Sequence, residues 1–416
     1  MKTILIFNIS GIGSDTGVNT YCKQLESYIC QNPPKKLRFY FVNLNANDKH
    51  GFNIVKTKFI NYINIPSPII ARQNYNSIFQ PAFGRTVADL LKAYIKLDSN
   101  IIIHLNWIDL GMMAGVLKSE LGCDLNCKII LTRHCIPSRT LLHTNYKDFL
   151  TVRHNSFNGQ LSYILGKELR HYYSIDKFIA VTECSKKDLI EKFAICEEKI
   201  SIIKNGVAET SIELNSLGKA FLRSKYNLSI GEKIIVYVGR DEKNIGLRWL
   251  LDAFKAILIE NQNVRLIIVG KINIAEIAKD NSEIMAKITI MGFVEQIKLF
   301  EIFQLCDLGI IPSAYEQCSY TAIEMMKCGL PILVSKVDGL AEMIENGVNG
   351  LTFNIHFKSS GISHDSSELK EKIKYALDNG NAEEIKKMVD FAKRQIIAIY
   401  SNVKMGNKLL EVYNAV

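Results

Sequence analysis

The apolar residues of this chain cluster in short runs that end at glycine, proline or polar residues, with little alternation of apolar and polar positions. Runs of this kind are typical of parallel strands that are buried on both faces. We therefore predict two sets of strands. The first set is Ile4–Asn8, Arg38–Asn43, Ile101–Leu105, Lys128–Thr132 and Phe178–Thr182, and the second is Ile234–Gly239, Val264–Val269, Ile288–Met291, Leu308–Pro312 and Ile332–Ser335.

Segments with apolar residues at helical spacing lie between these runs. They are Asn19–Ile29, Arg85–Lys96, Ser185–Phe193, Gly246–Ile259 and Ser319–Lys327. Alternation of strands and helices predicts an open, doubly wound α/β sheet. The alternation occurs twice and weakens over the polar stretch Asn205–Glu232, so we expect two Rossmann-like lobes that face a central cleft. We place the lobes at residues 1–206 and 207–390, and expect the C-terminal helix, about 391–416, to return to the first lobe.

The composition is that of a globular protein. The chain has 416 residues, of which 48% are apolar and 22% charged, which excludes global disorder and exceeds one ordinary core. The ten cysteines form no CxxC pair and no zinc spacing, which favours a reducing, cytoplasmic compartment. No run approaches the length of a membrane-spanning helix. The apolar run after Met1 is too short for a signal peptide, so we interpret it as a buried strand.

The most informative segment begins with D-L-G-I-I-P-S and is predicted to form a strand, a loop and a helix. Ser319 is suited to cap the helix, so the amides of Tyr320 and Thr321 would point from the helix start toward a ligand. Glu316 lies in the loop, and Glu324 lies just over one turn inside the helix. An anion site flanked by two carboxylates suits a nucleotide sugar, because one carboxylate can bond sugar hydroxyls and the other a ribose.

This segment resembles the retaining glycosyltransferases of glycosyltransferase family 4, which have the GT-B fold. The family signature is a glutamate, seven residues and a second glutamate, followed by an A-x-G-x-P-V-like strand. Glu316 and Glu324 have this spacing, and C-G-L-P-I-L-V follows them. The family often has G-F-G after the first glutamate, whereas this chain has Q-C-S. The resemblance is strongest over Phe178–Phe353 and implies that Glu316 positions the donor sugar.

Two further elements of the second lobe resemble parts of the family's donor site. Gly239-Arg240 followed by Lys243 resembles its Gly-Arg…Lys element, in which the two cations neutralise the donor diphosphate and stabilise the leaving group. Only two residues separate Arg240 from Lys243 here, fewer than is usual in the family. Phe293 and Val294 lie in a segment that resembles the family's G-x-V turn, whose backbone holds the nucleobase.

The first lobe has weaker candidates for the site. Gly17 lies at a helix entry, where the resemblance implies an approach to donor phosphate and acceptor. His134 ends a strand at the place of the family's His-Asp element, so it would contact the donor sugar, although a cysteine replaces the aspartate. Asn106, Trp107 and Arg133 are candidates for acceptor binding. A lone histidine is equally a structural residue, and Trp107 could equally belong to the core.

The resemblance implies a retaining hexosyltransferase that moves a hexose or an N-acetylhexosamine from a nucleoside-diphosphate sugar to an acceptor. A UDP-sugar is the favoured donor and GDP-mannose is an alternative, while the acceptor is a glycan, a lipid carrier, a small molecule or a peptide. No D-x-D sequence ends a strand, so we expect no metal and no other cofactor to be required. Two alternatives stay open: a GT-B nucleotide-sugar epimerase, which needs no acceptor, and a non-catalytic sugar-nucleotide-binding protein.

The formal net charge of +9 exceeds what a donor diphosphate needs. Between Lys128 and Lys177 lie eight lysines and arginines, three acidic residues and four of the eight histidines. This basic segment is either a solvated face or a surface that docks to an anionic membrane or acceptor. We therefore expect a cytoplasmic protein that can contact the inner face of the membrane peripherally. Nucleic acid is the least supported partner, because no nucleic-acid-binding module is present.

The segment Phe357–Ser367 is polar and contains S-S-G-I-S-H-D-S-S. Clusters of serine, glycine and aspartate between periodic segments are typical of loops. We therefore expect an exposed loop at this position.

Overall fold

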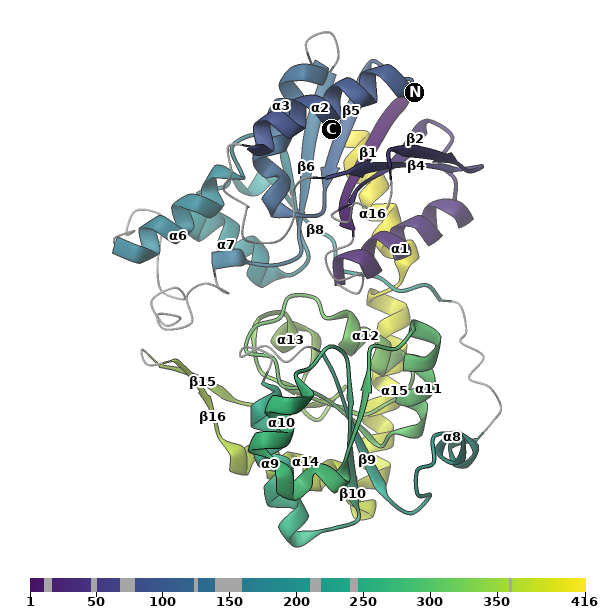
Figure 1. The fold of residues 1–416 in the computed structure, drawn as a ribbon, viewed down its shortest axis with the longest axis vertical. Coiled ribbons are helices and arrows are strands. Elements are labelled where there is room, and N and C mark those ends of the chain that lie inside the picture. The colour runs from purple at the N-terminus through teal and green to yellow at the C-terminus, as the bar shows by residue number, and fades with distance from the viewer. Residues whose placement is uncertain are drawn as a thin grey trace. The chain divides into compact units, whose positions relative to one another are not determined.

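The computed structural model describes residues 1–10, 17–45, 51–67, 79–122, 126–138, 159–209, 218–239, 246–358 and 361–416 (Figure 1). The chain forms two compact units, each built on its own sheet. The first comprises the described residues up to Ala208 together with Ser401–Val416, and the second runs from Glu209 to Tyr400. The boundary after Ala208 lies close to the predicted one at 206. None of the helices in the described ranges is long and apolar enough to cross a bilayer.

The first unit contains, within the described residues, an eight-stranded sheet in the order β3-β4-β2-β1-β5-β6-β7-β8. All neighbouring strands pair in parallel except β3 and β4. The strands are β1 (Lys2–Ser10), β2 (Leu37–Asn45), β3 (Asn53–Lys56), β4 (Ile60–Pro66), β5 (Asn100–Leu105), β6 (Asn126–Arg133), β7 (Lys177–Ala180) and β8 (Ile200–Ile202). The helices are α1 (Gly17–Gln31), α2 (Phe79–Tyr94), α3 (Gly111–Gly122), α6 (Gly159–Arg170), α7 (Glu183–Phe193) and α16 (Asn402–Ala415).

Both faces of this sheet are covered, as the lack of alternation predicts. Every residue of Ile4–Phe7 in β1 is fully buried. Leu5 belongs to a core cluster that also contains Val87 of α2. Phe39 of β2 lies against the ring of Tyr413 in α16, with ring centroids 6.3 Å apart. The buried apolar surface of the strands is therefore matched by amphipathic helices rather than by solvent.

The C-terminal helix α16 lies beside α1 in the first unit (Figure 1). Lys2 Nζ donates a hydrogen bond to the backbone oxygen of Tyr413 at 2.7 Å, and the Tyr28 hydroxyl donates one to Asn407 Oδ1 at 2.5 Å. A Cβ at Gly406 would lie 2.2 Å from the Tyr28 ring, so the two helices approach too closely for any larger residue. These contacts fix the last helix on the first unit.

The second unit contains, within the described residues, a parallel six-stranded sheet in the order β11-β10-β9-β12-β13-β14 and a two-stranded hairpin. The strands are β9 (Lys233–Val238), β10 (Val264–Val269), β11 (Ile288–Gly292), β12 (Leu308–Ile311), β13 (Ile332–Ser335), β14 (Leu351–Phe353), β15 (Ile355–Lys358) and β16 (Gly361–His364). The helices are α8 (Lys219–Lys225), α9 (Leu247–Glu260), α10 (Ile274–Asp280), α11 (Gln296–Leu305), α12 (Tyr320–Lys327), α13 (Asp338–Met343), α14 (Ser366–Leu377) and α15 (Ala382–Ile399).

Two sequence predictions differ from the structure. The return to the first unit begins at Ser401 rather than at about 391, because α15 packs on α12 within the second unit. The loop predicted over Phe357–Ser367 is wrong, because the hairpin of β15 and β16 and the start of α14 occupy most of it. Asp365 caps α14 by accepting hydrogen bonds from the amides of Ser367 and Glu368. Aspartate and serine therefore mark a helix start here rather than a continuing loop.

Candidate functional site

Glycines at the carboxyl ends of the second unit's strands bring several backbone segments close together. Gly270 has a φ of 124°, and a Cβ there would lie 1.8 Å from the backbone oxygen of Gly239. Gly246 has a φ of 73°, and a Cβ there would lie 1.8 Å from the backbone oxygen of Pro312. The Gly270 amide donates to the oxygen of Gly292 at 2.7 Å. The chain therefore converges at the edge where ligands bind in doubly wound sheets.

Gly239 and Gly246 bound the segment that contains Arg240 and Lys243. Those two cations lie outside the described residues, so their role at a donor diphosphate stays a prediction. The amide of Gly239 donates to the oxygen of Val269 at 3.0 Å, which fixes the start of the segment beside β10. Both ends of this segment thus lie at the same edge as the loop after β12.

Helix α12 begins at this edge with the predicted cap. Ser319 has an extended backbone, and its hydroxyl accepts a hydrogen bond from the amide of Ala322 at 3.4 Å. The N-cap prediction is therefore confirmed. The amides of Tyr320 and Thr321 belong to the first turn, where backbone N–H groups lack acceptors within the helix. The start of α12 therefore has the polarity and the donors that favour an anion.

Glu316 lies half-buried in the loop between β12 and α12. Its Oε1 accepts a hydrogen bond from the amide of Gln317 at 3.1 Å, and its backbone oxygen accepts one from Gly339 at 3.0 Å. Burial raises the pKa of the Glu316 carboxyl to about 7, and the nearby charge of Asp338 acts in the same direction. Near neutral pH this group can therefore either donate a hydrogen bond to a sugar hydroxyl or accept one from it.

Glu324 lies buried inside α12, and its Oε1 accepts a hydrogen bond from Gln296 Nε2 at 2.8 Å. Burial raises the pKa of Glu324 to about 7, while the Gln296 bond and the charge of Lys327 act in the lowering direction. Gln296 opens α11, directly after the segment of Phe293 and Val294. Phe293 is 59% exposed, so its ring is open to a ligand. The second glutamate and the predicted base-binding turn are thus brought together.

The carboxyl edge of the first unit holds a set of neutral polar side chains. Trp107 Nε1 donates a hydrogen bond to Asn8 Oδ1 at 2.9 Å, and Asn106 Nδ2 donates one to the oxygen of Phe7 at 3.3 Å. Asn106 Oδ1 lies 3.4 Å from His134 Nε2. The structure therefore brings three sequence candidates together, although their contact with donor or acceptor stays a prediction.

His134 is a neutral group in this structure. Its ring lies edge-on to the ring of Tyr21, with centroids 4.5 Å apart. Burial lowers the pKa of His134 to about 3. Gly17 begins α1, the helix that positions Tyr21, and is exposed. A neutral imidazole can hydrogen-bond a hydroxyl without adding charge, which fits the predicted contact with a sugar.

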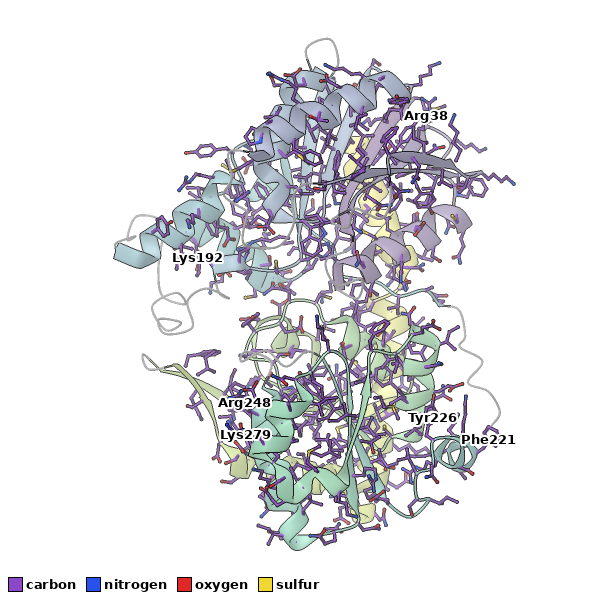
Figure 2. All side chains as sticks on the ribbon, in the orientation of Figure 1. Arg38, Lys192, Phe221, Tyr226, Arg248 and Lys279 are labelled. Carbon is purple, nitrogen blue, oxygen red and sulfur yellow. The ribbon has the colours of Figure 1, made fainter. Side chains whose placement is uncertain are left out.

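Arg133 is placed differently from the acceptor-binding role that we expected. Its side chain is fully buried, and its guanidinium pairs with Glu168 at 2.7 Å and donates to the Tyr172 hydroxyl at 2.9 Å. A second buried ion pair joins Lys192 and Asp188 of α7 at 3.0 Å. Lys192 is labelled among the side chains of the first unit in Figure 2. Arg133 therefore offers no exposed surface to an acceptor and holds β6 to α6.

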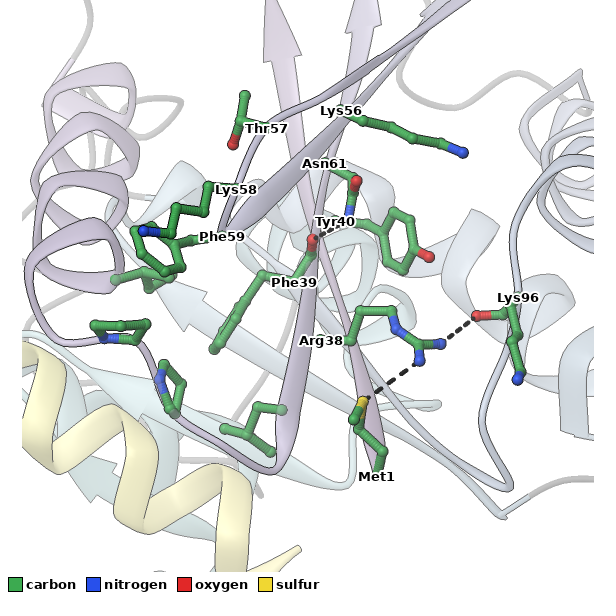
Figure 3. A pocket seen from close by; sticks show the side chains of 14 residues that line it. Met1, Arg38, Phe39, Tyr40, Lys56, Thr57, Lys58, Phe59, Asn61 and Lys96 are labelled. Atoms are coloured by element: carbon green, nitrogen blue, oxygen red, sulfur yellow. Dashed lines mark hydrogen bonds between the residues drawn. The ribbon is translucent and has the colours of Figure 1, made fainter.

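A pocket of about 480 Å³ lies at the opposite, amino ends of β2 and β4 (Figure 3). Its lining includes Arg38, Lys56, Lys58 and Lys96, and no acidic residue of the described chain lines it. Arg38 donates to the backbone oxygen of Lys96 at 3.1 Å and lies 3.4 Å from Asp98. Its guanidinium thus joins strand β2 to the segment before β5, and the pocket is separate from the candidate site.

The basic segment between residues 128 and 177 is described only in part. Arg139, Lys147, Arg153, His143 and His154 lie outside the described residues. Docking of this segment to a membrane or an acceptor therefore stays a prediction.

Two family models match the chain, one in each half. Residues 28–210 match the model described as Glycosyltransferase Family 4, and residues 232–379 match the model described as Glycosyl transferases group 1. An uncharacterised glycosyltransferase of Methanocaldococcus jannaschii is 32% identical over 184 residues, which cover 43% of this chain and 47% of that protein. The chain spans about half the length of the curated relatives that it matches first.

Solved structures are similar over the whole chain. Sucrose-phosphate synthase from Thermosynechococcus elongatus has a TM-score of 0.77 at 17% identity, covering 100% of this chain and 99% of that one. HepE from Anabaena, in complex with UDP-glucose, has a TM-score of 0.71 at 15% identity, covering 100% of both chains. The fold is therefore GT-B, as the sequence predicts. By fold the chain is a GT-B protein, and each of its two halves is similar in sequence to a glycosyltransferase family model.

Sequence reasoning missed three residues of this site: Gln296, Gly246 and Gly270. A glycine directly after an apolar run is a signal for a close backbone approach, so Gly270 could have been found. Gln296 has no such signal, because its contact with Glu324 joins two helices that only the fold brings together.

Proposed function

We propose that the chain is a retaining glycosyltransferase that moves a hexose or an N-acetylhexosamine from a nucleoside-diphosphate sugar to an acceptor. The second unit's strand edge carries this proposal, because Glu316 and Glu324 lie before and within a helix whose capped start suits an anion. A UDP-sugar is the favoured donor. HepE, a structural neighbour that holds UDP-glucose, supports that choice.

In this proposal the donor diphosphate lies at the start of α12. The amides of Tyr320 and Thr321 bind its oxygens, and Arg240 and Lys243 add positive charge. These groups stabilise the nucleoside diphosphate as it leaves, which is the step in which negative charge develops. They supply the charge that a metal ion would otherwise supply, so we propose that transfer continues when divalent cations are chelated.

The rest of the donor is bound by groups on either side of this helix start. Glu324 accepts the ribose hydroxyls, while Phe293 and Val294 border the base. Glu316 positions the sugar. The bond between the anomeric carbon and the donor phosphate oxygen breaks, and the acceptor oxygen bonds that carbon on the same face. The acceptor's proton passes to the donor phosphate oxygen, which leaves every proton accounted for without a separate base.

The test is a release assay for nucleoside diphosphate over a panel of UDP- and GDP-sugars, with and without candidate acceptors. We expect acceptor-dependent release from a UDP-sugar, with the product anomer retained by NMR. Glu316→Gln should slow release by roughly a hundredfold, whereas Glu345→Gln, at an exposed glutamate of the same unit, should leave it near the wild-type rate. Conversion of the donor without acceptor would instead indicate an epimerase, and binding without turnover a sugar-nucleotide-binding protein.

A further inference from the structure

One hydrogen bond joins the segment proposed for the nucleobase to the carboxylate proposed for the ribose. Gln296 Nε2 donates to Glu324 Oε1 at 2.8 Å. Gln296 is exposed and opens α11, two residues after Val294, whereas Glu324 is only 6% exposed inside α12. The sequence separates these two side chains by 28 positions, so the bond exists only because the two helices pack together.

Burial and the neighbouring groups act in opposite directions on the pKa of the Glu324 carboxyl. Burial raises the pKa of its carboxyl to about 7, while Gln296 and then Lys327 act in the lowering direction. The neighbouring thiol of Cys328 is neutral, because burial raises its pKa to about 12. Gln296 and Lys327 are thus the neighbours that lower the pKa of the Glu324 carboxyl. The amide of Gln296 therefore bears directly on whether this group is charged at neutral pH.

We propose that Gln296 is a positioning residue for the donor nucleotide: its amide holds one oxygen of Glu324, so that the other accepts the ribose hydroxyls beside the base turn. This inference rests on the proposed function. An ionised carboxylate accepts hydrogen bonds at both oxygens, whereas a protonated one uses one oxygen as a donor. Ribose hydroxyls that donate to Glu324 therefore bind best to the ionised form, which the Gln296 bond favours.

Two substitutions at this exposed position should move nucleotide binding in opposite directions. Gln296→Ala removes the donor, so Glu324 becomes protonated at higher pH and the affinity for UDP at pH 7 falls by roughly two- to fivefold. Because raising the pH restores the charge, the affinity should recover by pH 9. Gln296→Lys places a cation at the same carboxylate and should shift the midpoint of the affinity profile to lower pH. Each shift is expected to be about one pH unit or less.

The experiment is calorimetric titration of UDP into the full chain from pH 6 to pH 9. Gln304→Ala, on the same helix, is the matched control and should keep the wild-type profile. If the wild type binds neither UDP nor GDP at any pH, the proposed function fails and this inference with it. If the wild type binds but all variants share its midpoint, or if Gln296→Ala weakens binding equally at every pH, the inference alone is overturned.

Discussion

The carboxyl edges of the two sheets carry different titratable groups, and burial shifts the pKa values of these groups in opposite directions. The first unit presents neutral amide, indole and imidazole groups around His134, whereas the second presents the carboxyls of Glu316 and Glu324. Burial lowers the pKa of His134 to about 3 and raises that of each glutamate to about 7. Burial favours the neutral form in every case, because a charged group loses its hydration.

These pKa values determine which of the two edges changes its charge near neutral pH. Imidazole at the first edge stays neutral throughout the physiological range, so it can hydrogen-bond but does not titrate there. The two glutamates change charge near neutral pH. Of these three groups, the glutamates of the second unit are therefore the ones that can make activity depend on pH between about 6 and 8.

The largest expected effect concerns Arg133, the charged residue of the first edge. Arg133→Ala leaves Glu168 buried without its guanidinium partner and should destabilise the first unit by about 3–5 kcal/mol. Urea unfolding measures this loss. A double substitution, Arg133→Met with Glu168→Leu, should recover most of the stability. Normal stability of Arg133→Ala together with weakened acceptor binding would restore the acceptor role that the sequence suggested.

Substitution of Glu316 should have the next largest effect. Glu316→Gln keeps the shape of the side chain but can no longer ionise. Transfer should therefore fall by roughly a hundredfold, which corresponds to about 2.7 kcal/mol in the activation free energy. The release assay measures this rate. Turnover within a factor of two or so of the wild type would show that Glu316 does not position the sugar.

The glutamates should also make stability depend on pH. Their folded pKa of about 7 lies above the ordinary value of 4.5, so the folded state holds these protons more tightly than the unfolded state. The two protonated glutamates therefore make their full contribution to the free energy of unfolding below about pH 4.5. This contribution is lost as the pH rises through 7. Two carboxyl pKa values that rise from 4.5 to about 7 correspond to at most about 7 kcal/mol at pH 8. Because solvent screens the half-buried Glu316, we expect the double variant Glu316→Gln, Glu324→Gln to gain at least about 2 kcal/mol over the wild type at pH 8, and less than about 1 kcal/mol at pH 4.5. Equal differences at both pH values in urea titrations would contradict this.

His134 should give the smallest effect. His134→Gln keeps a neutral hydrogen-bonding side chain, so we expect roughly a tenfold loss of transfer, or about 1.4 kcal/mol. The pH midpoint of kcat/KM should stay where it is in the wild type, because this histidine titrates far below neutral pH. A pH profile shows whether the midpoint moves, and movement would mean that His134 is the titrating group.

The sequence predicted the central strands well because their signal is local. β1, β5, β9 and β10 are continuous apolar runs with clear boundaries. The predicted set does not include β4, which reads I-N-Y-I-N-I-P and carries asparagines among its apolar residues, nor the hairpin of β15 and β16, whose residues are mostly polar. Short or mixed strands are defined by their pairing partners, which a linear pattern does not contain.

The same division applies to the candidate site. Glu316, Ser319 and Glu324 were found because they belong to one short strand-loop-helix segment. The ion pair of Arg133 with Glu168 joins distant parts of the chain, so nothing near Arg133 in the sequence shows that the charge is already matched. The contact of Tyr21 with His134 was missed for the same reason. Motifs thus locate reactive groups, whereas their electrostatic state depends on tertiary neighbours.

Hydrogen exchange shows whether the donor nucleotide binds at the strand edge of the second unit, because it compares the two edges in one experiment. Amides of the full chain are followed by mass spectrometry with and without saturating UDP. We expect slower exchange in peptides that contain the segment 289–296 and the segment 316–327 of the second unit, and little change around Asn106 and His134. Protection confined to the first unit's edge, or no protection in either segment of the second unit under saturating UDP, would show that the nucleotide does not bind at the second unit's edge.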